Sequence, residues 1–432
     1  MLLALDTRLL CNLLLVALAA APAAAQAGIL DPGFGGGVLT EQISPSPSGD
    51  FAFAVLVQPD GKIVTAGRAR SAPGTPSSFA ITRHLPDGTL DTGFGSGGHV
   101  TAFAGGPRCV DVRLDAAGRI VAVGEVSGDV GVLRLTSSGA FDGTFGTGGL
   151  VQFSWAQNST DSASALALQP DGKIVVAGSF IRGSGQQAAV ARLLANGSLD
   201  KSFGNKGIAA LGSAGDGGNV EFGALAVQPD GKILVGGRSG SGARWSVRRL
   251  NANGSLDGSF GSGGVVSTSV GTDCSLSSMA LQPDGKIVTV GSFLAAPSPS
   301  PWYLAAVRYL PGGTLDPSFG AGGVAMVGLE CTPRRCVVQP DGRIVTGITL
   351  SSVAEHTHMT LFRLLGNGAP DAGFGTSGLA APTDPGGTAA REILSAVAID
   401  PTTANLVAAG ISEDAPFSTG VMRFALARWL GN

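Results

Sequence analysis

Hydrophobic residues recur along the chain in short runs separated by turns that are rich in Gly, Pro, Asp and Asn. In one clear stretch, apolar runs at residues 165–168, 173–178 and 188–192 predict three strands. The first two runs flank the turn Gln-Pro-Asp-Gly at residues 169–172. Proline presets φ at the second turn position and glycine accepts the left-handed conformation, so this turn predicts a hairpin.

The rest of this stretch predicts a loop and one more strand. Residues 179–186 are polar, and we expect them to form a loop between the second and third strands. After the third strand, a Leu-Asp-x-x-Phe-Gly element at residues 199–204 leads into an apolar segment at 207–210, which would supply an outer fourth strand. The unit therefore predicts a four-stranded antiparallel sheet.

Close copies of the Leu-Asp-x-x-Phe-Gly element occur seven times, at intervals of 51 to 60 residues. Their aspartates are Asp31, Asp91, Asp142, Asp200, Asp257, Asp316 and Asp371. Each unit also ends in an arginine, and these are Arg83, Arg134, Arg192, Arg249, Arg308, Arg363 and Arg428. The first six arginines lie eight residues before the next aspartate. The repeats run over residues 30–89, 90–140, 141–198, 199–255, 256–314, 315–369 and 370–432.

The two chain ends hold complementary halves of one arginine–aspartate pair. Arg428 has no aspartate after it, and Asp31 has no arginine before it. This split predicts that residues 30–42 complete the sheet whose other three strands lie within residues 393–429. Four short strands per repeat of this length are typical of β-propeller blades, whereas a solenoid would need atypical capping repeats. We therefore predict an all-β, seven-bladed β-propeller of four-stranded blades, closed by its N-terminal strand.

The repeats resemble a known family. The period, the Leu-Asp-x-x-Phe-Gly element and the recurrent Gln-Pro-Asp-Gly turns at residues 58–61, 169–172, 228–231, 282–285 and 339–342 are similar to the delta-60 repeat family of bacterial exported proteins. The resemblance covers essentially the whole chain after residue 25. It implies a propeller fold and an extracytoplasmic setting, and it implies no activity.

A position that is occupied in every repeat is first a structural one. An arginine at the end of a strand and a carboxylate eight residues later can meet across a turn as a bidentate pair that also binds the turn's backbone amides. The phenylalanine of each element is expected to plug the core between blades.

Composition narrows the classes of function. Hydrophobic residues make up 44% of the chain and charged residues 14%, and the formal net charge is -3. Basic residues are scattered over the repeats, so the electrostatic footprint of a nucleic-acid binder is missing. We expect no nucleic-acid partner, no cofactor and a monomer.

The first 25 residues read as a secretory signal peptide. An apolar run at residues 9–21 precedes the small residues Ala23, Ala24 and Ala25, and the run is shorter than a bilayer span requires. Cleavage near Ala25 would leave residues 26–432 as one domain, secreted or periplasmic, without a membrane span. The remaining cysteines, Cys109, Cys274, Cys331 and Cys336, permit a Cys331–Cys336 disulfide, a Cys274–Cys331 disulfide or buried free thiols.

Irregular positions are the better candidates for function, because propellers carry it on loops and at the mouth of the central channel. Trp245, Trp302 and Tyr303 break the pattern of small residues and are candidates to stack on sugar rings, although blade packing accounts for them too. His356 and His358 share one face of an extended segment and are weak metal-ligand candidates, with an exposed loop edge as the alternative.

Two functions follow from this reading. The first is a non-enzymatic binding or scaffold module for a protein or glycan. The alternative is an enzyme, a lyase or hydrolase, with its site at the channel mouth. The inner strands at residues 55–57, 165–168 and 225–227 carry almost no titratable side chains, which favours binding.

Overall fold

The computed structural model describes residues 27–35, 37–43, 49–70, 75–105, 108–183, 185–212, 220–239, 244–297, 300–350, 358–381, 391–413 and 421–431. The predicted signal peptide lies outside the described residues. Across these ranges the fold is all-β, with strands β1 to β27 and no helix. Accordingly, the described part of the chain offers no helix that is long and apolar enough to cross a membrane.

The strands form antiparallel sheets. Five sheets have four strands each: β2 (Phe51–Val57), β3 (Ile63–Arg70), β4 (Ser77–His84) and β5 (His99–Ala104); β6 (Arg108–Leu114), β7 (Ile120–Val126), β8 (Asp129–Leu135) and β9 (Leu150–Phe153); β10 (Thr160–Leu168), β11 (Ile174–Arg182), β12 (Gly185–Leu193) and β13 (Ile208–Ala210); β14 (Val220–Val227), β15 (Ile233–Ser239), β16 (Arg244–Leu250) and β17 (Val265–Thr268); and β25 (Arg391–Ile399), β26 (Leu406–Glu413), β27 (Met422–Trp429) and β1 (Val38–Glu41).

The sixth sheet has seven strands. They are β18 (Asp273–Leu281), β19 (Ile287–Leu294), β20 (Trp302–Tyr309), β21 (Val324–Val338), β22 (Ile344–Leu350), β23 (Thr360–Leu364) and β24 (Leu379–Ala380). Strand β21 is 15 residues long, and it pairs with β20 through its first part and with β22 through its second part. A single uninterrupted strand therefore joins two sets of strands that the repeat pattern treats as separate units.

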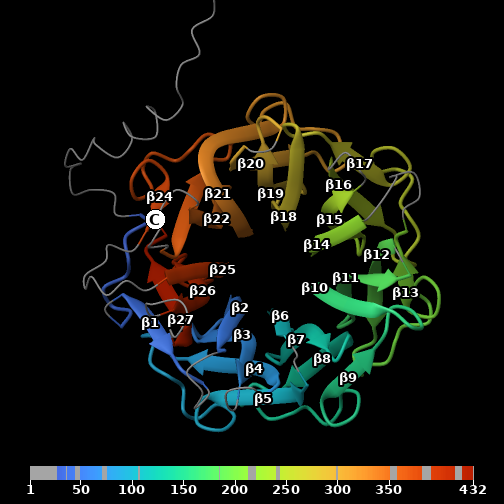
Figure 1. The fold of residues 1–432 in the computed structure, drawn as a ribbon, viewed down its shortest axis with the longest axis vertical. Helices are drawn as coiled ribbons and strands as arrows, with labels where there is room; N and C mark the ends of the chain where they lie inside the picture. Colours follow the sequence, from blue (N-terminus) through green and yellow to red (C-terminus); the bar gives the residue numbers. More distant parts are fainter. Residues whose placement is uncertain are drawn as a thin grey trace, which may run out of the picture.

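The N-terminal strand belongs to the C-terminal sheet. Strand β1 pairs with β27, and Asp31 N–H donates to the carbonyl oxygen of Arg428 (2.8 Å). Figure 1 shows the sheets arranged around a central opening, with β2, β6, β10, β14 and β25 toward it and β5, β9, β13 and β17 at the outside.

The core lies between neighbouring sheets. Each cluster of buried apolar residues draws on two adjacent sheets, as where Phe79 and Ile81 of β4 pack with Val112 of β6. The phenylalanine of every repeat element is completely buried, and these residues are Phe34, Phe94, Phe145, Phe203, Phe260, Phe319 and Phe374. Burial of one such ring contributes roughly 2 to 3 kcal/mol.

Two local features differ from the sequence-based expectations. The polar stretch at 179–186 extends the hairpin, because β11 and β12 stay paired as far as Arg182 and Gly185. Backbone pairing does not depend on side-chain polarity, and Phe180 buries its ring there. The four cysteines of the described residues are buried free thiols, so neither candidate disulfide is formed.

Candidate functional site

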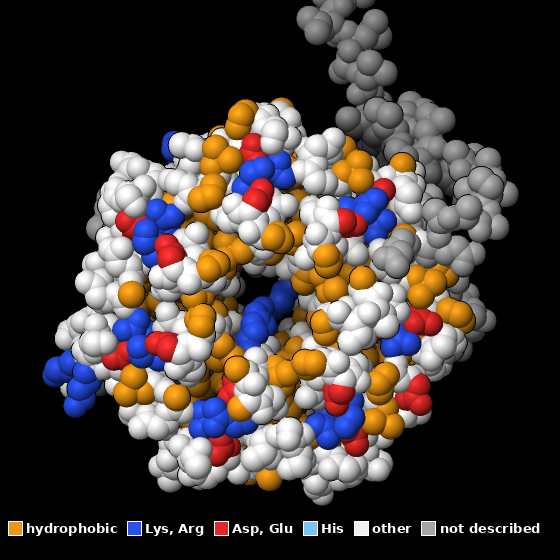
Figure 2. Space-filling model, turned by 180° about the vertical axis from the view of Figure 1, so that it is seen from behind, with side chains coloured by type: hydrophobic (Ala, Val, Ile, Leu, Met, Phe, Trp, Pro, Cys, Tyr) orange, Lys and Arg blue, Asp and Glu red, His pale blue; other side chains and the backbone are white. Residues whose placement is uncertain are grey.

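The inner strands enclose one cavity along the central opening. Its volume is about 520 Å³, and its lining residues come from β2, β6, β10, β14, β18, β21 and β25. Figure 2 shows Lys or Arg side chains inside this opening, surrounded by apolar residues. The charged residues that line the cavity are Asp111, Arg113, Arg334 and Arg335.

Asp111 on β6 is completely buried, and both of its carboxylate oxygens are occupied. Oδ1 accepts hydrogen bonds from the backbone N–H of Val112 (2.9 Å) and from Nη1 of Arg113 (2.6 Å). Oδ2 accepts one from the backbone N–H of Leu166 on the neighbouring sheet (2.9 Å) and lies 3.1 Å from Nη1 of Arg335. The carboxylate is thus saturated with donors.

Arg335 reaches across the cavity. It belongs to β21, and Figure 1 places β21 and β6 on opposite sides of the opening. The sheets of β25 and β2 lie between them on one side, and those of β10, β14 and β18 on the other. Besides facing Asp111, Arg335 donates through Nη2 to the carbonyl oxygen of Val110 (3.1 Å). We call the Arg335–Asp111 pair the channel bridge.

The two residues of the channel bridge occupy one repeat position. Each lies four residues before the first residue of its hairpin turn, which is Asp115 in one unit and Gln339 in the other. The other five units carry small residues at this position: Ala54, Ala165, Ala224, Ser278 and Ala396. One acid and one base therefore replace small side chains at the same register on opposite walls.

A β-bulge places two arginines at this point of β21. The ladder between β21 and β22 shifts register between Pro333 and Cys336, so Arg334 and Arg335 stand opposite the single residue Gly347. A bulge of this kind re-aims side chains. Both arginines line the cavity.

The cavity carries an excess of positive charge. Three guanidinium groups face one carboxylate, and among the described residues Arg334 has no ion-pair or hydrogen-bond partner. The channel walls desolvate Arg334 and lower its pKa from the ordinary value. Desolvation also lowers the pKa of Arg113, and the like charge of Arg335 adds to this effect while Asp111 opposes it.

The repeated arginine–aspartate pairs lie away from the cavity and hold neighbouring units together. In one unit, Nε of Arg249 donates to Oδ2 of Asp257 (2.7 Å), Nη2 to Oγ of Ser259 (3.2 Å) and Nη1 to the carbonyl oxygen of Pro311 in the next unit (2.6 Å). Its guanidinium carbon lies 4.6 Å from the ring centre of Phe260. The pair is not bidentate, because the second arm of the arginine reaches the next unit.

The same Nε–Oδ2 contact, at 2.7 or 2.8 Å, occurs in all seven pairs: Arg83–Asp91, Arg134–Asp142, Arg192–Asp200, Arg249–Asp257, Arg308–Asp316, Arg363–Asp371 and Arg428–Asp31. Each aspartate also accepts a hydrogen bond from a backbone N–H two residues later.

The aromatic candidates lie elsewhere. Trp245 is completely buried within β16, so its ring has no face accessible to a sugar. Trp302 and Tyr303 begin β20 and are half-buried, and the Tyr303 ring centre lies 5.8 Å from that of Phe293. Stacking on sugar rings by these residues stays a prediction.

Of the two histidine candidates, the structure describes His358. His356 lies outside the described residues, and Nδ1 of His358 is 3.8 Å from Oε2 of Glu392. No three His, Cys, Asp or Glu side chains converge on a metal position anywhere in the described ranges.

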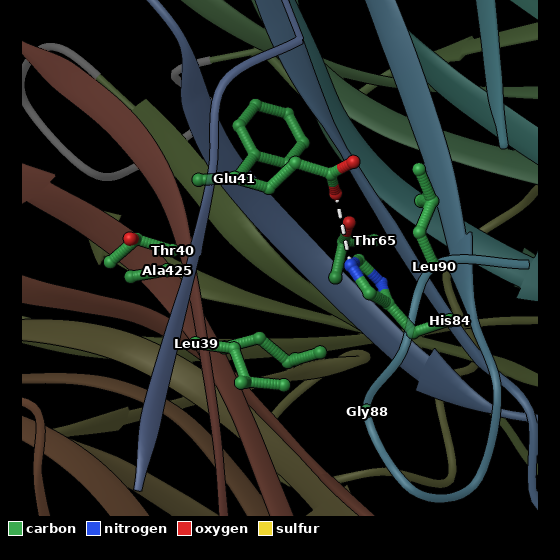
Figure 3. Close-up of a pocket in the computed structure, with 10 residues that line it drawn as sticks. Leu39, Thr40, Glu41, Thr65, His84, Gly88, Leu90 and Ala425 are labelled. Atoms are coloured by element: carbon green, nitrogen blue, oxygen red, sulfur yellow. Dashed lines mark ion pairs between the residues drawn. The ribbon is translucent and has the colours of Figure 1, made fainter. Parts of the chain in front are cut away.

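A smaller cavity of about 190 Å³ lies between β1 and β4. Figure 3 shows Glu41 of β1 pointing toward His84 of β4, and Oε2 of Glu41 is 2.9 Å from Nε2 of His84. Oε1 of the same glutamate is 3.4 Å from Nε2 of His99. These contacts tie the N-terminal strand to the sheet of β2 to β5.

Sequence reasoning missed the channel residues. It considered the inner strands at residues 55–57, 165–168 and 225–227, which carry no titratable side chain, and did not consider β6 and β21, which contribute four. The available signal was the departure from small residues four positions before the turn in two of seven units.

Comparison with known proteins agrees with the repeat pattern. Six segments match the repeat described as domain of unknown function DUF5122, beta-propeller: residues 58–94, 118–145, 169–203, 228–260, 282–319 and 339–374. The chain is a β-propeller repeat protein. No curated protein sequence matches it.

Several solved structures are similar to this chain, and one of them reaches a TM-score that supports the fold, and the fold alone. The polysaccharide lyase Uly1 is 10% identical with a TM-score of 0.50, and the match covers 88% of this chain and 89% of that one. A protein of unknown function from Dyadobacter fermentans is 13% identical with a TM-score of 0.41, covering 92% and 100% of the two chains. Sqt1 from Chaetomium thermophilum is 13% identical with a TM-score of 0.45, covering 91% and 89%.

Proposed function

We propose that this propeller is an exported, non-catalytic binding module of delta-60 type that takes its ligand in the central cavity. The observation that carries the proposal is the concentration of charge there. Asp111, Arg113, Arg334 and Arg335 meet in a cavity whose other lining residues are apolar or small and polar. A cavity of several hundred Å³ with a few convergent polar groups is the usual form of a small-ligand site.

The proposed architecture is a ring of seven blades. The seven strands that line the cavity supply one inner strand to each blade, with the second half of β21 as one of them. The first half of β21 completes the preceding blade. Pairing of β1 with β27 supports closure of the ring by the N-terminal strand.

Binding fits the cavity better than proton-transfer chemistry does. A lyase or hydrolase needs a group that accepts a proton from its substrate or from water. Asp111 is the one carboxylate among the described lining residues, and its oxygens accept two contacts each. Arginines stay protonated and supply positive charge instead of a base. The similarity to a polysaccharide lyase keeps catalysis as the alternative to be tested.

A matched pair of tryptophan substitutions tests the proposal on residues 26–432. Ser277 lines the cavity, whereas Ser267 is exposed on the outer strand β17. Thermal shifts are measured against neutral and anionic glycans and small organic acids, since a ligand at 100 times its Kd adds roughly 2.7 kcal/mol of stability. We expect Ser277→Trp to abolish the shift and Ser267→Trp to preserve it.

The opposite pattern, or a shift that both variants keep, would place the ligand outside the channel. Chromatography of each glycan after prolonged incubation with the protein tests catalysis. Product that appears with wild type and disappears with Ser277→Trp would establish an enzyme and overturn the binding proposal.

A further inference from the structure

The contacts around the channel bridge occupy only some of the N–H groups of Arg113 and Arg335. A guanidinium carries five N–H donors and no acceptor. Arg113 uses Nη1 toward Asp111 and the carbonyl oxygen of Val112, and Arg335 uses Nη1 toward Asp111 and Nη2 toward Val110. The remaining N–H groups of both side chains have no further partner among the contacts of the described residues.

Arg334 adds a whole guanidinium without a counter-charge. The residue is exposed to the cavity, whereas Arg335 beside it is half-buried. No carboxylate other than Asp111 lines the cavity in the described part of the chain, and Asp111 is already saturated. Arg334 therefore presents an unpaired positive charge to the cavity.

We propose that the cavity is an oxyanion site in which Arg334 and the free donors of Arg335 and Arg113 bind a carboxylate, sulfate or phosphate group of a small molecule. This inference rests on the proposed function, because it names the ligand class of the same cavity. Planar guanidinium groups match such oxyanions through paired N–H donors. The volume of about 520 Å³ admits a small organic anion and not a folded partner.

Two adjacent arginines of β21 are placed to serve one ligand. Arg334 and Arg335 oppose one residue of β22, and both line the cavity. Arg335 is held in place by Asp111 and by the carbonyl oxygen of Val110, so it presents its remaining donors from a fixed position. Arg334 has no such contact and is available to close on the bound group.

Calorimetric titration of residues 26–432 tests the inference. The ligands are inorganic phosphate, inorganic sulfate, citrate and glucuronate, with glucose as the uncharged counterpart of glucuronate. The variants are Arg334→Gln and Arg334→Lys. Arg238→Gln is the matched control, because Arg238 is an exposed arginine outside the cavity whose nearest acid, Asp273, lies 3.4 Å away.

We expect at least one of the four anions to bind wild type and glucose not to bind. Arg334→Gln should weaken that binding roughly 10- to 100-fold, which is the range for a lost hydrogen bond to a charged group. Arg334→Lys should weaken it less, and Arg238→Gln should leave it unchanged. The melting temperature of ligand-free Arg334→Gln should not fall, since the side chain it replaces has no partner to lose. Inorganic and organic anions together distinguish a free ion from a ligand that carries the group.

Three results would overturn the inference. They are no binding of any anion, equal binding to wild type and Arg334→Gln, and anion binding that survives Ser277→Trp. If a neutral glycan binds and Ser277→Trp abolishes its binding, the binding module stands and only the oxyanion assignment is wrong. The proposed function fails with the inference when no ligand of either kind depends on the cavity.

Discussion

The channel bridge should behave as one energetic unit when its two residues are replaced by alanine. Alanine is the residue found at this position in four other units, so the double variant Asp111→Ala/Arg335→Ala extends a small lining that the fold already uses. Neither substitution adds bulk to the core.

The contacts give different magnitudes for the two single variants. Asp111→Ala removes a completely buried carboxylate, leaves two arginines without their counter-charge and frees the N–H groups of Val112 and Leu166. Breaking a buried pair from one side costs about 3 to 5 kcal/mol. Arg335→Ala leaves Asp111 with three donors, and the loss of one hydrogen bond to a charged group costs roughly 1.5 to 3 kcal/mol.

The double variant should be more stable than the sum of the single losses implies. Removing Asp111 leaves the half-buried Arg335 without its counter-charge, and removing Arg335 as well relieves that cost. We therefore expect a coupling free energy of roughly 1 to 3 kcal/mol, the range for residues in direct contact.

Urea unfolding at 25 °C, followed by circular dichroism and by tryptophan fluorescence, supplies the four free energies of the cycle. Both probes should report one transition, so that the free energies are comparable. Losses that add to within about 0.5 kcal/mol would refute the reasoning. That result would mean that the two side chains do not stabilise each other across the channel.

The other predictions concern the repeated pairs and the thiols. Asp31→Ala and Arg428→Ala should each destabilise the protein, and the loss in the double variant should be smaller than the sum of the two. Both losses should exceed those of the same changes at Asp200 and Arg192, because the pair at the chain ends joins residues 397 apart in sequence. Equal melting points for the two sets of variants would count against closure by the N-terminal strand. Hydrogen bonds from Thr144 hold the pKa of Asp142 at about 2, below the ordinary value of 3.8. The low pKa stabilises the folded protein by roughly 2 kcal/mol above pH 4, and this contribution is lost as the pH falls toward 2. In wild type the urea midpoint should therefore fall over that interval, and Asp142→Asn should make the fall smaller. An equally steep fall in Asp142→Asn would show that Asp142 is not the group responsible. Burial raises the pKa of all four described thiols, so a thiol reagent at pH 8 should label residues 26–432 only after denaturation, and rapid labelling of the native protein would show that the thiols are accessible.

The repeat made much of the local structure predictable. Runs of apolar residues around the Gln-Pro-Asp-Gly turn predicted the hairpin of β10 and β11, and those strands pair from Leu168 and Ile174 outward. The constant spacing of eight residues predicted that Arg192 would meet Asp200, and Nε of Arg192 lies 2.8 Å from Oδ2 of Asp200. Both features depend on contacts within one unit, which a local pattern records.

Contacts between distant units were harder to anticipate. Asp111 and Arg335 are separated by more than two hundred residues, and neither side chain stands out within its own strand. Their meeting depends on the register of two strands relative to the channel, including the bulge between Pro333 and Cys336. Trp245 shows the converse problem: from the sequence it allowed either sugar stacking or blade packing, and its ring is completely buried in the core between two sheets.

The residues that line the cavity are different from the residues that hold neighbouring units together. The arginine–aspartate pairs and the buried phenylalanines secure each unit to the next, and none of them lines the cavity. The cavity, in turn, is lined by the residue four positions before the hairpin turn in six units: Ala54, Asp111, Ala165, Ala224, Ser278 and Arg335. Single substitutions at these equivalent positions would therefore change the chemistry of the cavity and leave the contacts between neighbouring units untouched.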